Sequence, residues 1–266
     1  MKFSIIINTH NQEQYLERAI NSCLMQKSKS YEIIIVDTSK KKNYKIRKKY
    51  NKNKIVKFID LKTKFKHPVR DQLYKILKGL RISKGKYIAL LDGDDYFSSK
   101  KLKIINNLIK KNINFICNQD RPVLINENNK NEMKKPSKKF YKNYKLFKLL
   151  INNWPQVYTT SSITVKKDIL NNFFKNTNPF KWKFLAIDIL LIIYCNVYYS
   201  FFDYGENITY KSINETSLDD RYANYFNKKY WIRRGEQHNY YLSLNNKKKF
   251  KGLDYYLTKF LIYLIK

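Results

Sequence analysis

Three carboxylates stand within four residues at Asp92-Gly93-Asp94-Asp95, directly after the apolar run Tyr87–Leu91. A short apolar run that ends in turn residues is typical of a buried parallel strand. Carboxylates this close repel one another unless a cation neutralises them, and Mg²⁺ or Mn²⁺ prefers such oxygen ligands. The alternative is an acidic turn that only caps the next helix, because Asp-Gly pairs are common in turns.

Three upstream strands and three helices must position this acid turn. Strands are predicted at Phe3–Asn8, Tyr31–Val36 and Ile55–Leu61, and helical patterns begin near Glu13, Lys41 and Val69. No hairpin signal joins these strands, which favours right-handed parallel βαβ units. The carboxyl ends of such strands lie at one edge of the sheet, where open α/β sheets bind their ligands.

Polar residues follow the first two strands at that edge: Asn8, Thr9, His10 and Asn11 after the first, and Asp37 and Thr38 after the second. We expect Asn11 to be the N-cap of the first helix. A helix N-terminus aimed at a strand end favours anions. For the lone His10, a solvent-facing loop position is an equal alternative.

The second half of the chain carries weaker patterns. Further strands are predicted at 113–118, 159–165, 197–202 and 206–211, and further helices at 98–111, 144–152, 167–174 and within 180–195. The apolar window 184–202 is long enough to span a membrane, but Asp188 inside it would be costly there. We therefore expect a buried helix that runs into a strand.

The net charge of +33 is the outlying feature of the composition. Such a field attracts polyanions, including nucleic acid, anionic lipid and nucleotide phosphates. Because Lys, Asn, Ile and Tyr are all abundant, A/T-rich coding explains much of the lysine.

The three cysteines show no zinc-ligand spacing and suit a reducing cytosol. The apolar run at the amino end is too short for a signal peptide, so a cytoplasmic location is expected.

At the carboxyl end, residues 216–266 are predicted to form a basic helical extension. Its apolar residues fall on one helical face: Leu253, Tyr256, Leu257, Phe260, Leu261 and Leu264. Lysines flank this face, a pattern that can lie on an anionic membrane surface. The alternative is that the face packs on the domain and the lysines are only solvated.

Four segments together resemble the GT-A-fold glycosyltransferases of family 2. They are FSIIINTHN at 3–11, YEIIIVD at 31–37, the run from Gly79 through the acid turn to Asp95, and Ile187-Asp188. The resemblance covers residues 1–215 and is most specific over the first hundred. It implies an α/β fold with a mainly parallel central sheet, a nucleotide-binding half at 1–100 and an acceptor half at 101–215.

The resemblance also implies a reaction. The enzyme would transfer a sugar, with inversion, from a nucleotide-sugar donor, most simply a UDP-sugar, to a glycan or lipid-linked acceptor in cell-surface polysaccharide synthesis. Asp92, Asp94 and Asp95 would hold Mn²⁺ or Mg²⁺ against the donor diphosphate, with Gly93 at the donor. Asp188 would deprotonate the acceptor hydroxyl. A peripheral position on the inner face of the membrane follows from a lipid-linked acceptor.

The chain departs from the family pattern at several positions. Asn8 replaces a proline and His10 an aromatic residue, and Thr38 replaces the second acid that accepts the base N3–H. The Arg-Asn pair before Gly79 is absent, so Arg70 is a candidate for the diphosphate contact. Alternatively, Arg70 is a surface arginine that pairs with Asp71 or with solvent.

Lys211, late in the chain, is a second candidate to close over the diphosphate.

Two other function classes remain open. The charge alone would suit a basic nucleic-acid-binding protein, although no nucleic-acid signature appears and no specific nucleic acid is expected as a partner. A nucleotidyltransferase has a related sheet but usually opens with a glycine-rich loop, which 8–12 lacks. No pattern points to a particular oligomeric state.

Overall fold

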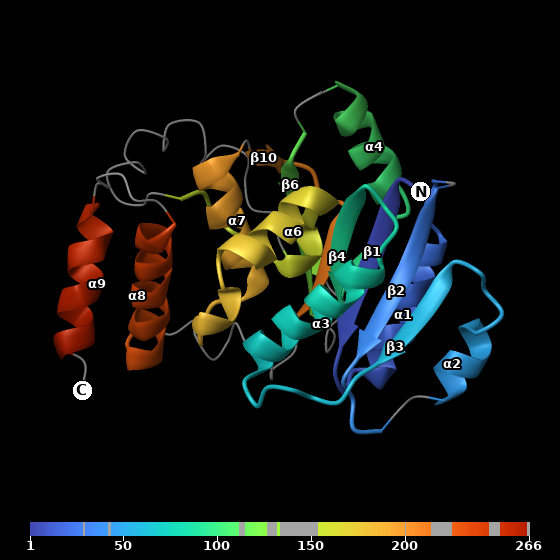
Figure 1. The fold of residues 1–266 in the computed structure, drawn as a ribbon, viewed down its shortest axis with the longest axis horizontal. Helices are drawn as coiled ribbons and strands as arrows, with labels where there is room; N and C mark the ends of the chain where they lie inside the picture. The colour runs from blue at the N-terminus through green and yellow to red at the C-terminus, as the bar shows by residue number, and fades with distance from the viewer. Residues whose placement is uncertain are drawn as a thin grey trace.

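The computed structural model describes residues 1–28, 30–41, 44–111, 115–126, 132–133, 154–199, 201–213, 225–244 and 251–264. The amino-terminal half forms one side of an α/β body, and the carboxyl-terminal helices lie at the opposite end (Figure 1).

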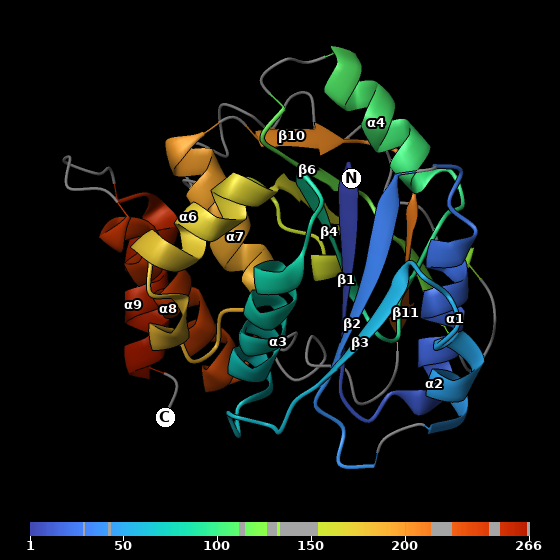
Figure 2. The ribbon, with the colours of Figure 1, turned by 45° about the vertical axis from the view of Figure 1, so that its right-hand side comes forward.

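The central sheet has seven strands in the order β10-β6-β9-β4-β1-β2-β3. Its bounds are β1 (Phe3–Thr9), β2 (Tyr31–Asp37), β3 (Val56–Asp60), β4 (Tyr87–Asp92), β6 (Cys117–Asp120), β9 (Ile163–Lys166) and β10 (Phe201–Tyr204). Strands β1 to β4 pair in parallel, whereas β9 is antiparallel to both β4 and β6. Figure 2 shows β1, β2 and β3 side by side. The predicted mainly parallel sheet is confirmed.

Helices cover both faces of this sheet because the strand residues alternate between two apolar clusters. Ile6 of β1 packs in the cluster with α3 (Pro68–Ile82), α6 (Lys167–Asn176) and α7 (Ile187–Tyr198). Ile5 and Ile7 pack in the other cluster. Its helices are α1 (Glu13–Leu24), α2 (Tyr44–Tyr50) and α4 (Lys101–Lys111). Burial on both faces explains why the strands read as continuous apolar runs.

A second, smaller sheet begins directly after the acid turn, in the order β5-β11-β7-β8. Its bounds are β5 (Tyr96–Phe97), β7 (Val123–Asn126), β8 (Glu132–Met133) and β11 (Thr209–Ile213). Tyr96 of β5 stacks on Tyr210 of β11 with ring centroids 4.7 Å apart. The late strand β11 is thereby brought beside the acid turn.

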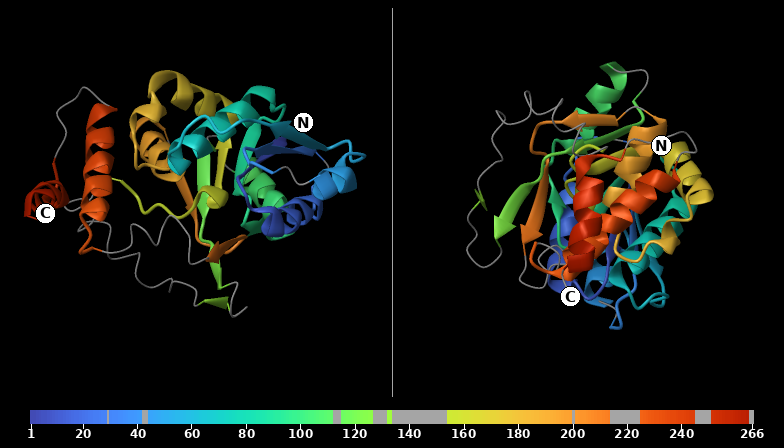
Figure 3. Two further views of the ribbon diagram at one scale, coloured as in Figure 1. Left: turned by 90° about the horizontal axis from the view of Figure 1, so that it is seen from below. Right: turned by 90° about the vertical axis from the view of Figure 1, so that its left-hand side faces the viewer.

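The carboxyl-terminal helices are α8 (Lys228–Ser243), which packs against α7, and α9 (Leu253–Leu264), which packs against α8. Figure 3 shows this pair at the end of the molecule away from β1 to β3. Within the part of the chain that the structure describes, no helix has both the length and the apolar character needed to cross a bilayer. The window 184–202 is a buried helix followed by β10, as expected.

Several predicted strands differ in the structure. The strand expected at 197–202 is β10, which begins at Phe201 because α7 continues to Tyr198, and the strand expected at 206–211 is β11. The strand expected at 113–118 is β6, which begins at Cys117. The strand expected at 159–165 starts as a 3₁₀ turn, η2 (Thr160–Ser162), and becomes β9 only at Ile163. The hydroxyl of Ser162 donates to the Thr159 carbonyl at 2.7 Å, a local bond that competes with strand pairing. The helix predicted at 144–152 lies outside the described residues.

Candidate active site

Asp92, the last residue of β4, is held by side chains from two neighbouring elements. Asn8 of β1 lies opposite it in the strand register, and its Nδ2 donates to Asp92 Oδ1 at 2.7 Å. Gln72 Nε2 of α3 donates to the same oxygen at 2.9 Å. The residue that replaces the family's proline therefore orients the first carboxylate of the acid turn.

Gly93 follows where the turn passes close to the β1 loop. A Cβ at this position would lie 2.7 Å from Thr9 Oγ1 and 2.8 Å from Gln12 Oε1. The Gly93 amide donates to the Asn8 carbonyl at 2.9 Å. Any side chain here would push the acid turn away from β1.

Asp95 is 2% exposed, and protein groups engage both of its carboxylate oxygens. Ser161 Oγ of η2 donates to Oδ2 at 2.6 Å, and the Ser212 amide of β11 donates to Oδ1 at 3.0 Å. The described residues hold no group of three or more metal-ligating side chains. Asp95 is thus turned into the protein, and its predicted part in a metal set with Asp92 and Asp94 stays a prediction.

Asp94 carries the carboxylate most suited to a cation. Its backbone carbonyl is fixed by Arg18 Nη2 at 2.8 Å and by Ser212 Oγ at 2.6 Å. Burial and the charge of Asp92 raise the pKa of the Asp94 carboxyl to about 6. Burial likewise raises the pKa of Asp92, against the hydrogen bonds from Asn8 and Gln72.

A divalent cation fits this pair of carboxylates. Two half-buried acids, of which Asp92 disfavours the ionisation of Asp94, provide oxygen ligands whose charge a cation would relieve. Mg²⁺ in such sites is usually held by one or two carboxylates plus substrate phosphates, so a third protein carboxylate is not required. Asp92 and Asp94 are the residues that would hold it.

Lys211 lies near the same carboxylates. It belongs to β11, and its charge lowers the pKa of both Asp92 and Asp94, after the larger effects of burial. The structure thus brings together a late cation and the acid turn, which lie more than a hundred positions apart in the sequence.

Arg70 contacts the backbone of a neighbouring segment, and its role at the diphosphate stays a prediction. Its Nη2 donates to the Lys181 carbonyl at 3.2 Å, which joins α3 to the short helix η3 (Pro179–Lys181). Asp71, the alternative partner, accepts from Thr38 Oγ1 at 2.8 Å and lies 3.5 Å from Lys75 Nζ.

The residues that follow β2 are buried and engaged. Asp37 is 3% exposed; its Oδ1 accepts from the Ser39 amide at 2.7 Å and its Oδ2 from Arg47 at 3.1 Å. The Thr38 hydroxyl donates to Asp71, so toward any other group it can only accept. This arrangement supplies a carboxylate behind Thr38, where the family usually carries one at position 38 itself.

The loop after β1 packs onto this region. His10 Nδ1 lies 3.0 Å from the Thr38 carbonyl, so the lone histidine is not simply a solvent-facing residue. Asn11 adopts φ 52°, and its amide donates to Ser39 Oγ at 2.7 Å. The N-cap prediction for Asn11 was wrong: Gln12 is at the N-cap and makes no side-chain capping bond.

Asp188 lies in the first turn of α7 and is half-buried. Its Oδ1 accepts from the Ile189 amide at 2.7 Å. The segment before α7 packs on the amino end of α3, with the rings of His67 and Phe184 5.5 Å apart. Phe184, four residues before Asp188, therefore lies beside the start of α3, the helix whose Gln72 bonds Asp92.

Several site residues carried no signal in the sequence. Gln72, Ser161 and Arg18 each contact the acid turn from a distant segment. Lys75 is 5% exposed within α3, donates to the Thr9 carbonyl at 3.3 Å, and has its pKa lowered by burial. A lysine in a helix reads as a solvated residue until the packing is known.

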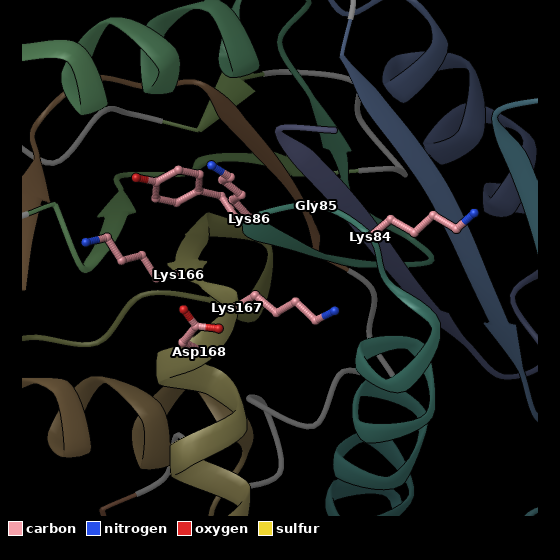
Figure 4. Close-up of a pocket in the computed structure, with 7 residues that line it drawn as sticks. Lys84, Gly85, Lys86, Lys166, Lys167 and Asp168 are labelled. Atoms are coloured by element: carbon pink, nitrogen blue, oxygen red, sulfur yellow. The ribbon is translucent and has the colours of Figure 1, made fainter.

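A cavity of about 390 Å³ lies at the opposite edge of the sheet. It is lined by Lys84, Gly85, Lys86, Tyr87, Lys166, Lys167 and Asp168 (Figure 4). These residues stand at the amino end of β4 and the carboxyl end of the antiparallel β9. None of the candidate site residues lines this cavity, so it is not part of the site at the acid turn.

Comparison with known proteins identifies the family of the chain. Residues 4–174 match the family model described as Glycosyl transferase family 2. An uncharacterized glycosyltransferase of Rickettsia conorii is 32% identical over 130 residues, which are 48% of this chain and 20% of that protein. One of Nostoc sp. is 25% identical over 217 residues, 74% of this chain and 60% of that protein. The chain thus spans less than two thirds of either relative.

Solved structures share the fold. The structure of Staphylococcus aureus TarS 1–349 in complex with UDP superposes with a TM-score of 0.65 at 16% identity, covering 98% of this chain and 70% of that one. A mannosyltransferase of Pyrobaculum calidifontis in complex with GDP-Man and Mn²⁺ gives 0.61 at 10% identity, covering 99% and 70%. At these identities the likeness shows the fold alone.

Proposed function

The chain belongs to glycosyl transferase family 2 and is a glycosyltransferase, and from that premise we propose a metal-dependent, inverting transfer of a sugar from a nucleotide-sugar donor. The observation that carries this proposal is the Asp92–Asp94 pair at the carboxyl edge of the sheet. Burial raises the pKa of both carboxyls, and the Lys211 charge acts on both. A site of mixed charge at a strand edge suits a cation together with a diphosphate.

The donor diphosphate would lie between the acid turn and Lys211. Mn²⁺ or Mg²⁺ on Asp92 and Asp94 supplies positive charge that stabilises the diphosphate leaving group. Lys211 adds a second positive charge from the side of β11. Arg70, which bonds the Lys181 carbonyl, keeps a diphosphate role only if that bond is exchanged for the donor.

A UDP-sugar is the first donor to test. The Thr38 hydroxyl, whose proton is engaged by Asp71, would accept a hydrogen bond from a base N–H. Uracil and guanine both present a ring N–H, whereas the corresponding nitrogens of cytosine and adenine are acceptors. The solved relatives bind UDP and GDP-Man, which agrees with this selection. His10 and Asn11 would border the base.

Asp188 would be the base that removes the proton from the acceptor hydroxyl. Its position at the start of α7, four residues after Phe184 beside the start of α3, whose Gln72 bonds Asp92, supports this role. Inversion follows if one carboxylate deprotonates the hydroxyl while that oxygen attacks the anomeric carbon from the face opposite the diphosphate.

The acceptor would be a glycan or a lipid-linked glycan. One S. aureus relative, 29% identical over 106 residues (39% of this chain, 18% of that protein), is named as a poly(ribitol-phosphate) beta-N-acetylglucosaminyltransferase. A cell-surface polymer is therefore the acceptor class we propose for this chain.

The outward face of α9 supports contact with an anionic membrane surface. Asp254 on its inward side pairs with Arg234 and His238 of α8, so α9 buries a polar side. Its large apolar side chains are exposed instead: Leu253, Tyr256, Leu257, Phe260, Tyr263 and Leu264. Their exposure supports a membrane contact over packing of this face on the domain, and the strong positive charge favours anionic lipid.

A panel of sugar nucleotides tests the transfer. Thermal shift and calorimetry should find a UDP- or GDP-sugar that binds only with Mn²⁺ or Mg²⁺, whereas CDP- and ADP-sugars bind weakly. A generic oligonucleotide serves as the second arm, because charge alone would produce salt-dependent binding there. If no donor binds with metal while the oligonucleotide does, the proposed function is wrong.

Sedimentation with vesicles tests the membrane contact. The protein should bind vesicles that contain phosphatidylglycerol and bind less to pure phosphatidylcholine. Leu257→Ser with Phe260→Ser should weaken vesicle binding, whereas Tyr44→Ser, which alters an exposed aromatic residue of α2, should not. If both variants bind the vesicles equally well, α9 is not the contact surface.

A further inference from the structure

Lys101 is a fully buried cation close to the candidate active site. It opens α4, and its exposed fraction is zero. Its Nζ donates to Asp120 Oδ1 at 2.8 Å, to the Ser161 carbonyl at 2.8 Å and to Thr209 Oγ1 at 2.6 Å. All three donors of the ammonium group are thus used, by β6, η2 and β11.

The Phe97 ring of β5 closes this cage, with its centroid 4.2 Å from Lys101 Nζ. Asp120 is also fully buried, so the pair has no access to solvent. A buried ion pair is weak evidence for stability, because apolar residues of similar size often fold as well. A role other than stability is therefore needed to explain the Lys101–Asp120 pair.

Ser161 indicates what this role is, because it connects Lys101 to the acid turn. Its carbonyl accepts from Lys101, while its hydroxyl accepts from the Asp92 amide at 3.0 Å and donates to Asp95 Oδ2 at 2.6 Å. One fully buried serine therefore contacts both ends of the acid turn and is itself held by the ammonium group.

Lys101 also holds the other element that fixes the turn. Thr209 opens β11, the strand whose Ser212 bonds Asp95 through its amide and the Asp94 carbonyl through its hydroxyl. The same strand carries Lys211. One ammonium group therefore sets the distance between η2 and β11, the two elements that contact the acid turn from either side.

We propose that Lys101 is a positioning residue for the metal-binding carboxylates, acting through Ser161 and Thr209. This inference rests on the proposed function for the identity of the ligand, but not for the geometry of the turn. Lys101 touches no reacting group. Its effect is to keep Asp92 and Asp94 at a spacing that one cation can bridge.

The test removes both charges together. Lys101→Met alone would leave Asp120 buried and unpaired, which is strongly destabilising. Lys101→Met with Asp120→Asn removes both charges with little change in volume, and we expect its thermal midpoint to recover. Binding of Mn²⁺ alone, followed by electron paramagnetic resonance, should still be weaker by about 10–100-fold, the usual cost of losing an outer-shell partner.

Amide exchange gives a readout that needs neither metal nor donor. In the folded double variant, peptides that span 91–97 should exchange about tenfold faster than in the wild type, because the Asp92 amide loses its fixed acceptor. Peptides of β2 serve as the internal control. If the double variant does not fold, Ser161→Ala replaces it. This variant keeps the carbonyl but removes the hydroxyl, and we expect the same faster exchange at 91–97.

Two results would overturn the proposal. Unchanged exchange at 91–97 in either folded variant would reduce Lys101 to a structural role. So would wild-type Mn²⁺ affinity in the double variant. If the wild type binds no metal, the proposed function fails, and the exchange data still decide whether Lys101 positions the turn.

Discussion

The acid turn and the α8–α9 pair are built on opposite arrangements of polar and apolar groups. At the turn, polar side chains lie inside the protein and are engaged: Asp95 is 2% exposed and both of its oxygens accept hydrogen bonds. At α9, the polar Asp254 faces inward and the apolar side chains face solvent.

The difference separates a site that is closed around its chemistry from a surface that is open to a partner. Buried carboxylates that repel one another are costly unless a ligand or a function accompanies them. An exposed apolar face is costly unless something covers it. We therefore expect ligand binding at the acid turn to depend on single polar atoms. We expect membrane binding by α9 to depend on the total exposed apolar area.

The largest expected effect is the loss of the general base. Asp188→Asn should lower turnover by about 10²–10⁴-fold, because the acceptor hydroxyl loses its proton acceptor. Donor affinity, measured by calorimetry with Mn²⁺, should stay near the wild-type value. Asp168→Asn, which alters an exposed carboxylate in the first turn of α6, is the matched control. Turnover retained in Asp188→Asn would place the base elsewhere.

The second prediction separates Asp94 from Asp95. Asp94→Asn should fold normally and lose metal-dependent donor affinity by about 10–100-fold or more, since a direct ligand is removed. Asp95→Ala should instead lower stability by about 1–3 kcal/mol, because Ser161 and the Ser212 amide lose their acceptor. Denaturant unfolding and calorimetry on both variants would show if the roles are reversed.

The third prediction concerns the contact between α8 and α9. Asp254→Asn removes the charge that pairs with Arg234 and His238, at N···O distances of 2.7 and 2.8 Å. The free energy of unfolding should fall by about 1–3 kcal/mol, since these partners lose a charged acceptor. Asp168→Asn should change it by less than about 0.5 kcal/mol. Equal effects would mean that the pairing does not hold α9.

The smallest expected effect is a pH dependence. The pKa of Asp94 is raised from 3.8 to about 6, so the folded state binds this proton more tightly than the unfolded state. Its contribution to stability is complete below pH 3.8 and is lost as the pH rises through 6. In metal-free protein, the gain in thermal midpoint from pH 7 to pH 5 should be smaller in Asp94→Asn than in the wild type. Equal gains would contradict the raised pKa.

The central sheet and the place of the acid turn could be predicted from the sequence because they depend on local patterns. Continuous apolar runs such as Ile5–Ile7 and Ile33–Val36 report burial on both faces, and the turn chemistry at Gly93 marks a strand end. The exact register, which places Asn8 opposite Asp92, is a finding of the structure. The role of Asp188 as the base was predicted only through the family resemblance, and it stays a prediction.

The tertiary structure decided which groups hold each carboxylate of the acid turn. Nothing local distinguishes Asp95 from Asp94; the difference arises from Ser161 and Ser212, which are far away in the chain. The same holds for Lys101, which reads as one solvated lysine among many and is fully buried. Hydrophobic periodicity determines which elements form, whereas hydrogen-bond partners depend on which elements meet, and the meeting of distant segments leaves no periodic trace in the sequence.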